Sequence, residues 1–100
     1  MTTQESNKLI AEFMDYPDLG NKGDFSYLKY HSSWDWLMPV VEKIEGEPHL
    51  CKVIIETNYC RVERNSGEHI LTMGSQNLTK KEATYKAVVE FIKWYNKQKK

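Results

Sequence analysis

Cysteine is scarce in this chain, and its scarcity excludes one common way of holding a small domain together. Only Cys51 and Cys60 occur among 100 residues, too few for the disulfide framework of a small secreted protein. The chain is nevertheless long enough to bury roughly two-thirds of its unfolded surface. With 40% hydrophobic and 12% aromatic residues, we expect one domain over residues 1–100 that is held by its core.

An excess of charge of one sign is also absent. Fourteen Lys and Arg residues balance fourteen Asp and Glu residues, so the formal net charge is zero. Nucleic-acid binders usually carry a basic excess or a basic face, since neutralisation of phosphates supplies much of their affinity. The balance makes a nucleic-acid partner less expected, and weak charge repulsion favours self-association into a homo-oligomer.

Long apolar runs are missing as well. A membrane-spanning helix needs about 18 or more consecutive apolar residues, and no segment comes near that length. Residues 1–6 have neither the basic region nor the apolar region of a secretory signal peptide. We therefore expect a cytoplasmic protein with no membrane partner.

Catalytic motifs are not found either. Ser32 and Ser33 lie beside His31 and Asp35, which together contain the residue types of a nucleophile, a base and an orienting group. Neighbouring positions at a helix start seldom converge in space, and serine before a helix is typical of a cap. We expect no catalytic residue and no enzyme activity.

The spacing of histidine and cysteine does not indicate a metal site. His31, His49 and His69 are far apart, and His49 with Cys51 has no second close pair to complete a ligand set. We expect surface histidines, core cysteines, no bound metal and no cofactor.

What is present predicts an α+β fold. Apolar spacing indicates a helix at 5–14, and Pro17 with Gly20 begins a loop that continues to 31. A second helix either begins near Asp35, which puts Pro39 in its first turn, or kinks at Pro39. We place Trp34, Leu37, Met38, Val41 and Ile44 on its inner face. Residues 50–73 indicate a meander, and a last helix follows. The expected order is α-α-β-β-β-α, a layered sandwich with a three-stranded antiparallel sheet packed with helices.

Alternation and charge predict the register of the first hairpin. A turn at Thr57-Asn58 places Ile55 opposite Cys60 and Cys51 opposite Arg64. The inner face then carries Cys51, Val53, Ile55, Cys60 and Val62. On the other face Lys52 meets Glu63, and opposite charges in such a pair support the register.

The last helix has the clearest start. Thr79 and Glu82 form a capping box, and the apolar stripe runs on to Tyr95. Val89 and Ile92 widen this stripe beyond one face, which indicates either deep burial or contact with another subunit.

Three segments carry a family resemblance: residues 7–14 (NKLIAEFM), 30–44 (YHSSWDWLMPVVEKI) and 81–96 (KEATYKAVVEFIKWYN). Together they resemble small proteins of phages and prophages, particularly those of Bacteroidetes hosts, grouped with the phage ABA-sandwich domain. The resemblance implies a layered α/β/α domain in the cytoplasm of the host cell. It implies neither an agreed activity nor catalytic residues.

The order of elements also resembles that of a double-stranded RNA-binding domain. Lys80 and Lys81, at the start of the last helix, are similar to the lysines with which that domain meets phosphates, and Lys86 would join them. The zero net charge, the loop without the expected glycines and the aromatic last helix depart from the pattern.

An aromatic cluster gives the candidate binding site. Tyr27, Tyr30, Trp34 and Trp36 lie close together, and the two tryptophans point about 200° apart on a helix. Both cannot face one core. Two interpretations follow: one tryptophan is exposed and able to stack a nucleobase, or both pack in the core or an interface. The candidate ligand-binding residues are Tyr30, Trp36, Lys29, Arg61 and Arg64.

These features lead to two functional hypotheses. One is a homo-oligomeric phage accessory protein that captures a host defence factor or a small nucleotide ligand, acting as a counter-defence sponge for a nucleotide immune signal. The alternative is an RNA-binding protein that uses Lys80, Lys81 and Lys86, or a protein–protein adaptor.

Overall fold

The computed structural model describes residues 2–15, 28–46 and 49–98, and its elements follow in the predicted order. The helices are α1 (Thr3–Phe13), α2 (Trp34–Glu45) and α3 (Lys80–Gln98). The strands are β1 (Cys51–Ile55), β2 (Tyr59–Arg64) and β3 (His69–Gly74). The α+β class and the antiparallel meander are confirmed. Most of the expected loop at 15–31, including Tyr27, lies outside the described residues.

The register of the β1–β2 hairpin is the predicted one. Every pair is observed, from Cys51 opposite Arg64 to Ile55 opposite Cys60. The inner face is more buried than the outer face because side chains alternate along each strand. Pairing of β2 with β3 is interrupted by one bulge after Val62.

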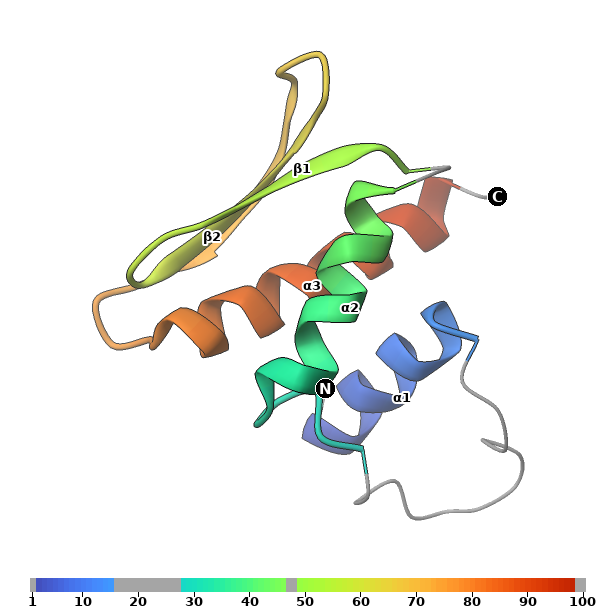
Figure 1. Ribbon diagram of the computed structural model, residues 1–100, viewed down its shortest axis with the longest axis vertical. Coiled ribbons are helices and arrows are strands. Elements are labelled where there is room, and N and C mark those ends of the chain that lie inside the picture. Colours follow the sequence, from blue (N-terminus) through green and yellow to red (C-terminus); the bar gives the residue numbers. More distant parts are fainter. Residues whose placement is uncertain (1, 16–27, 47–48, 99–100) are drawn as a thin grey trace.

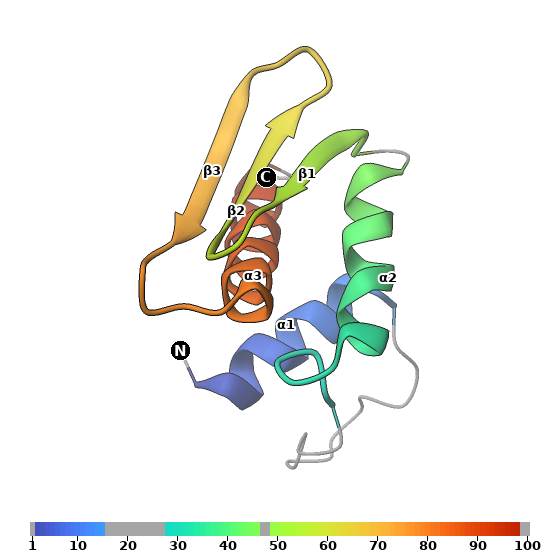
Figure 2. The same ribbon diagram turned by 60° about the vertical axis from the view of Figure 1, so that its left-hand side comes forward.

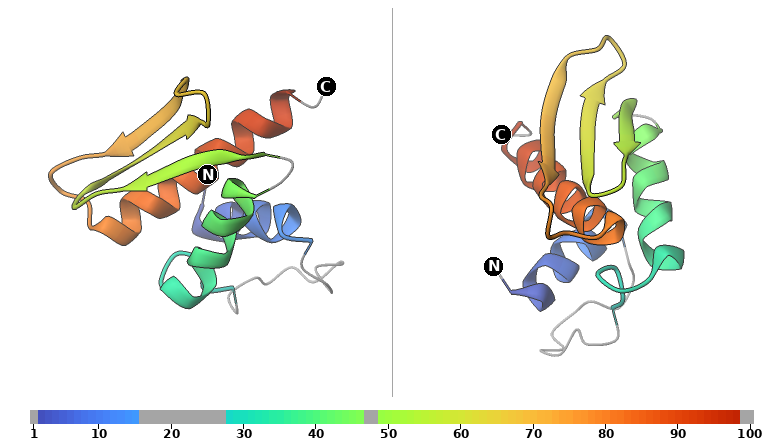
Figure 3. Two further views of the ribbon diagram at one scale, coloured as in Figure 1. Left: turned by 45° about the horizontal axis from the view of Figure 1, so that its top comes forward. Right: turned by 90° about the vertical axis from the view of Figure 1, so that its left-hand side faces the viewer.

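The helices lie on one face of the sheet. Helix α3 packs beneath β2 and β3, and α2 packs beneath β1 (Figures 1 and 2). Helix α1 packs on α3 on the side away from the sheet, so the layers are the sheet, then α2 with α3, then α1. No described helix covers the outer face of the sheet (Figure 3). Within the three described stretches, no helix has the combined length and apolar character needed to cross a bilayer.

Helix α1 begins earlier than its apolar pattern predicted because polar residues set its start. The Thr2 hydroxyl accepts from the Glu5 N–H at 3.1 Å, and the Glu5 carboxylate accepts from the Thr2 N–H at 2.8 Å. This reciprocal capping box satisfies two N–H groups that the first turn leaves without partners. The buried face of α1 includes two polar residues, Ser6 and Asn7, beside Ile10 and Ala11.

Helix α2 turns a different face to the core than predicted. Its buried residues are Leu37, Val40, Val41 and Ile44, whereas Met38 is 36% exposed. The expectation that Met38 lies on the inner face is therefore wrong, because the helix is rotated so that Val40 points inwards. Pro39 lies inside the helix, which begins at Trp34.

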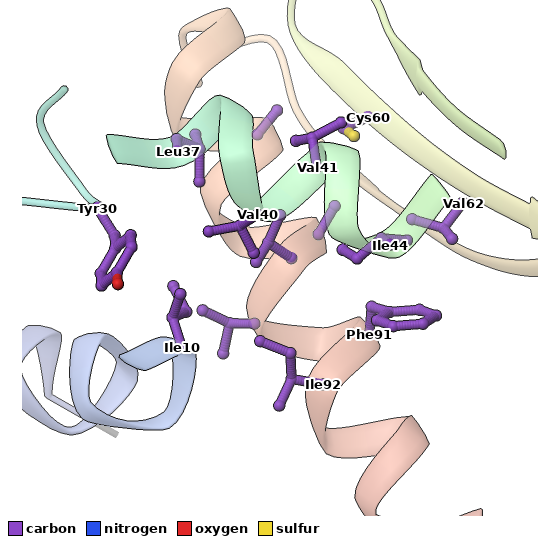
Figure 4. Close-up of a cluster of buried hydrophobic side chains, with 14 of the residues drawn as sticks. Ile10, Tyr30, Leu37, Val40, Val41, Ile44, Cys60, Val62, Phe91 and Ile92 are labelled. Carbon is purple, nitrogen blue, oxygen red and sulfur yellow. The ribbon is translucent and has the colours of Figure 1, made fainter. Parts of the chain in front are cut away.

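Helix α3 is buried on two sides because it lies between the sheet and α1. The predicted capping box is present, with the Thr79 N–H donating to Glu82 Oε1 at 2.9 Å. Val89 and Ile92 are 5% and 1% exposed, so the wide apolar surface is covered within the chain itself. Figure 4 shows Phe91 and Ile92 of α3 among core residues from α1, α2 and β2.

Candidate functional site

The aromatic residues at the start of α2 pack against one another. Tyr30 is 3% exposed, and its ring meets that of Trp36 edge to face with centroids 5.2 Å apart. Figure 4 shows Tyr30 beside Ile10 of α1. Trp34 and Trp36 are both half-buried against the core, so the structure agrees with the interpretation that both pack and not with the one in which a tryptophan is exposed. The physical reason is a turn closed on the Lys29 carbonyl, which folds Tyr30 back over Trp36.

The two candidate arginines lie elsewhere and apart from each other. Arg61 and Arg64 are three residues apart on one strand, so their side chains leave opposite faces of the sheet. Arg61 Nε lies 2.9 Å from Glu63 Oε2. Arg64 pairs with Glu68 at 2.6 Å, and its guanidinium lies 5.3 Å from the centroid of the Trp94 ring.

The structure therefore distributes the five candidate ligand-binding residues over separate regions. The β2–β3 turn beside Arg64 lies at one end of the long axis, and the segment that carries the exposed Lys29 and the buried Tyr30 lies at the other end (Figures 1 and 2). Only Tyr30 and Trp36 are brought into contact among the five. No shared binding surface follows from this set.

The three lysines of the RNA-binding alternative diverge around α3. Lys81 Nζ donates to the Ser32 carbonyl at 2.9 Å, which ties the start of α3 to the turn before α2. Lys80 and Lys86 are both exposed. Since residues are about 100° apart around a helix, Lys86 points about 120° away from Lys80. The three ammonium groups do not form one phosphate-binding row.

The cysteines lie on the inner face of the sheet as free thiols. Cys60 is fully buried, and burial raises the pKa of its thiol to about 11, while a hydrogen bond with Thr84 acts in the opposite direction. Across residues 2–15, 28–46 and 49–98 there is no group of three His, Cys, Asp or Glu residues that could hold a metal ion.

The sequence did not reveal a cavity of about 500 Å³ between the C-terminal parts of all three helices. We call it the aromatic pocket. Its lining comes from the end of α1 and the residues just after it, from α2, from the segment before β1 and from α3. The lining residues are Leu9, Glu12, Phe13, Asp15, Lys43, His49, Ile92, Tyr95 and Asn96. Its volume is within the range of small-molecule sites.

Aromatic rings form much of the pocket wall. The His49 imidazole meets the Tyr95 ring edge to face at 4.5 Å and lies 5.2 Å from the Phe13 ring. Fully buried Phe91 lies behind them, 5.7 Å from His49. Helix α3 presents Phe91 and Tyr95 together because residues four apart share one face.

Lys43 supplies the positive charge of the pocket. Its ammonium donates to the Phe13 carbonyl, lies 4.7 Å from the centroid of the Phe13 ring and is 3.6 Å from Asp15 Oδ2. A cation suits the end of α1, where carbonyls lack helical partners and the dipole is negative. Lys43 therefore holds the end of α1 against α2 and so helps to keep the pocket formed.

The surroundings of His49 favour the neutral form of its imidazole. Partial burial lowers the pKa of its imidazole, and the nearby charge of Lys43 lowers it further. A neutral imidazole presents one donor and one acceptor nitrogen. This residue was expected at the surface, and it is instead half-buried because rings from two helices lie against it.

The pocket has the chemistry of recognition. Its rings can stack a planar ligand, and Glu12, Asp15 and Asn96 carry oxygen acceptors for N–H groups on the ligand's edge. The described lining includes no Ser, Thr or Cys that could act as a nucleophile beside His49. The arrangement can therefore hold a ring and hydrogen-bond to its edge.

Distance along the chain explains why no sequence pattern predicts this pocket. Phe13, Lys43, His49 and Tyr95 come from four separate segments, and none has a neighbour in sequence with which it forms a motif. The available signal was weak: aromatic residues in the last turns of two helices, and a lysine in the last turn of another.

Comparisons with protein-family models, with curated proteins and with solved structures found no match for this chain.

Proposed function

We propose that this protein is a non-catalytic binding module that captures a small planar heteroaromatic molecule, of the size of a nucleobase or nucleoside, in the aromatic pocket. The observation that carries the proposal is a cavity of about 500 Å³ whose walls include the rings of Phe13, His49 and Tyr95. Pockets of this size with aromatic walls and a few polar groups are the usual form of small-ligand sites.

The charges around the pocket favour recognition of the ring over recognition of a phosphate. Glu12 and Asp15 contribute two carboxylates. Lys43 is the one lysine that the described residues contribute to the lining, and it is already paired with Asp15. A bound phosphate would meet two negative charges, while the N–H groups of a base would meet acceptors. We expect a nucleoside to bind at least as tightly as its 5′-monophosphate, and with little dependence on salt.

The biological role that we attach to this binding is sequestration. A nucleotide signal would be held by its base and not turned over, in the host-cell cytoplasm and by a homo-oligomer, as a phage counter-defence sponge does. The phage-like resemblance of the sequence and the recognition chemistry of the pocket support this role.

Titration calorimetry, with saturation-transfer NMR for weak binding, tests the proposal against the four common ribonucleosides and their 5′-monophosphates. Stacking on an aromatic side chain contributes about 1–3 kcal/mol per base. Tyr95→Leu should therefore weaken binding roughly 5- to 140-fold. Tyr59→Leu is the matched control, since Tyr59 lies on the outer face of the sheet, away from the pocket.

Two outcomes would refute the proposal. One is that no nucleoside or nucleotide of the panel binds at millimolar concentration. The other is binding that Tyr95→Leu leaves unchanged although the variant remains folded by circular dichroism. Binding of duplex RNA that weakens steeply with salt and with Lys80→Glu would point to the RNA-binding alternative instead.

A further inference from the structure

The sheet has two edges, and the described part of the chain (residues 2–15, 28–46 and 49–98) places a guarding group at only one of them. Strand β2 is central, and β1 and β3 are the outer strands (Figure 2). Along β1, α2 packs close by, and Glu45 Oε2 accepts from the Val53 N–H at 3.3 Å, which occupies a donor that the edge would otherwise offer. Natural proteins protect sheet edges by such charged or covering groups, because an open edge can pair with another strand.

Main-chain hydrogen bonding shows which residues of β2 face β3. In an antiparallel ladder, successive residues direct their N–H and C=O groups to opposite neighbours. The Glu56 N–H donates to the Tyr59 carbonyl at 2.8 Å, so Tyr59 faces β1. Cys60 and Val62, one and three residues later, therefore face β3.

The same alternation identifies the main-chain N–H and C=O groups that point outwards at the free edge of β3. Met73 and Leu71 lie opposite these two residues of β2 and direct their main-chain groups inwards. Thr72 and Gly74 consequently direct their N–H and C=O groups outwards, away from the sheet. Both residues are exposed.

The composition of β3 offers no barrier to pairing. Its sequence, HILTMG, contains no Lys, Arg, Asp, Glu or Pro. Its Ile, Leu, Thr and Met side chains suit a strand or a half-buried surface, and the Gly74 end carries no side chain to obstruct a neighbour. A second copy of the same strand would bring no like charges together, and the net charge of the whole chain is zero.

We propose that a second copy of this chain pairs antiparallel along β3, with Thr72 opposite its symmetry mate, so that the two three-stranded sheets form one sheet of six strands. A two-fold axis at Thr72 satisfies its outward N–H and C=O with the same groups of the partner copy, and a threonine pair across strands is favourable. This inference does not depend on the ligand, since no residue of β3 lines the aromatic pocket.

Sedimentation equilibrium on the full chain, from about 1 µM to about 500 µM, tests the assembly, because dimer formation depends on concentration. We expect a monomer–dimer equilibrium. Thr72→Lys should weaken it at least about tenfold, because it places two ammonium groups opposite each other. Thr57→Lys is the matched control: it adds the same charge at an exposed position in the β1–β2 turn.

Amide exchange measured by NMR gives a second readout that a general loss of fold cannot imitate. The amides of Thr72 and Gly74 should gain protection as the concentration rises, and this gain should vanish in Thr72→Lys. A monomer at the highest concentration overturns the proposal. So does a dimer that Thr72→Lys does not weaken, or one in which these two amides stay unprotected.

Discussion

The buried amide of Asn7 joins three parts of the fold, and removing its partner gives a sharp test of the packing. Asn7 is 1% exposed. Its Nδ2 lies 3.3 Å from the Leu28 carbonyl and 2.9 Å from His31 Nδ1, and its Oδ1 accepts from the Tyr85 hydroxyl at 3.0 Å. The amide thereby ties α1 to α3 and to the segment before α2.

The expected loss of stability for each substitution depends on which buried groups lose their hydrogen-bond partners. Tyr85→Phe leaves the buried Asn7 Oδ1 without its donor, and such a loss costs about 1–3 kcal/mol. Tyr85 is half-exposed, so water can reach the site and we expect about 1 kcal/mol. Asn7→Ala also leaves the carbonyl of fully buried Leu28 without this donor, and we expect about 2–3 kcal/mol.

A double-mutant cycle isolates the shared hydrogen bond. The two single changes remove the same hydrogen bond. The double variant should therefore be about 1 kcal/mol more stable than the sum of the two single losses of stability predicts. Urea unfolding followed by circular dichroism measures each free energy of unfolding. Tyr59→Phe is the control: its hydroxyl makes an exposed 3.4 Å contact with Glu56, and we expect almost no change. If Tyr85→Phe matches the wild type and the coupling is close to zero, this amide does not hold the helices together.

Three further predictions concern a glycine, a histidine and a cysteine. Gly74→Ala should lower the free energy of unfolding by more than about 1 kcal/mol, because a Cβ there would lie 2.6 Å from the Tyr59 Cα. Gly46→Ala is the control, since its Cβ would have no contact closer than 3.4 Å and it should lower that free energy far less. Thermal unfolding measures both changes. The pKa of His49 is lowered from 6.5 in the folded protein, so the unfolded chain binds more protons as the pH falls below 6.5, and stability should decline there. His49→Phe should flatten this decline in pH-dependent unfolding, and an identical slope would contradict the assignment. The pKa of the buried Cys60 thiol is raised to about 11, so iodoacetamide at pH 8 should label it only on unfolding, and rapid labelling of the folded protein, read by mass spectrometry, would contradict its burial.

Local patterns were sufficient for the sheet and for the start of α3. Hydrophobic alternation and the facing charges of Lys52 and Glu63 fixed the hairpin register, because a slip of one residue would turn every side chain to the wrong face. The Thr79–Glu82 box marked the start of α3, since both partners of a cap lie within four residues. These signals are short in sequence and need no knowledge of the rest of the chain.

Only the tertiary structure decided which aromatic residues pack together and where a cavity remains. The sequence grouped Tyr30 with Trp36, and the fold buries Tyr30 because the turn before α2 folds it against that ring. The aromatic pocket instead brings Phe13, His49 and Tyr95 together from three distant segments. Their meeting depends on the angles at which three helices cross, and those angles are set by packing of the whole core, which no local pattern encodes.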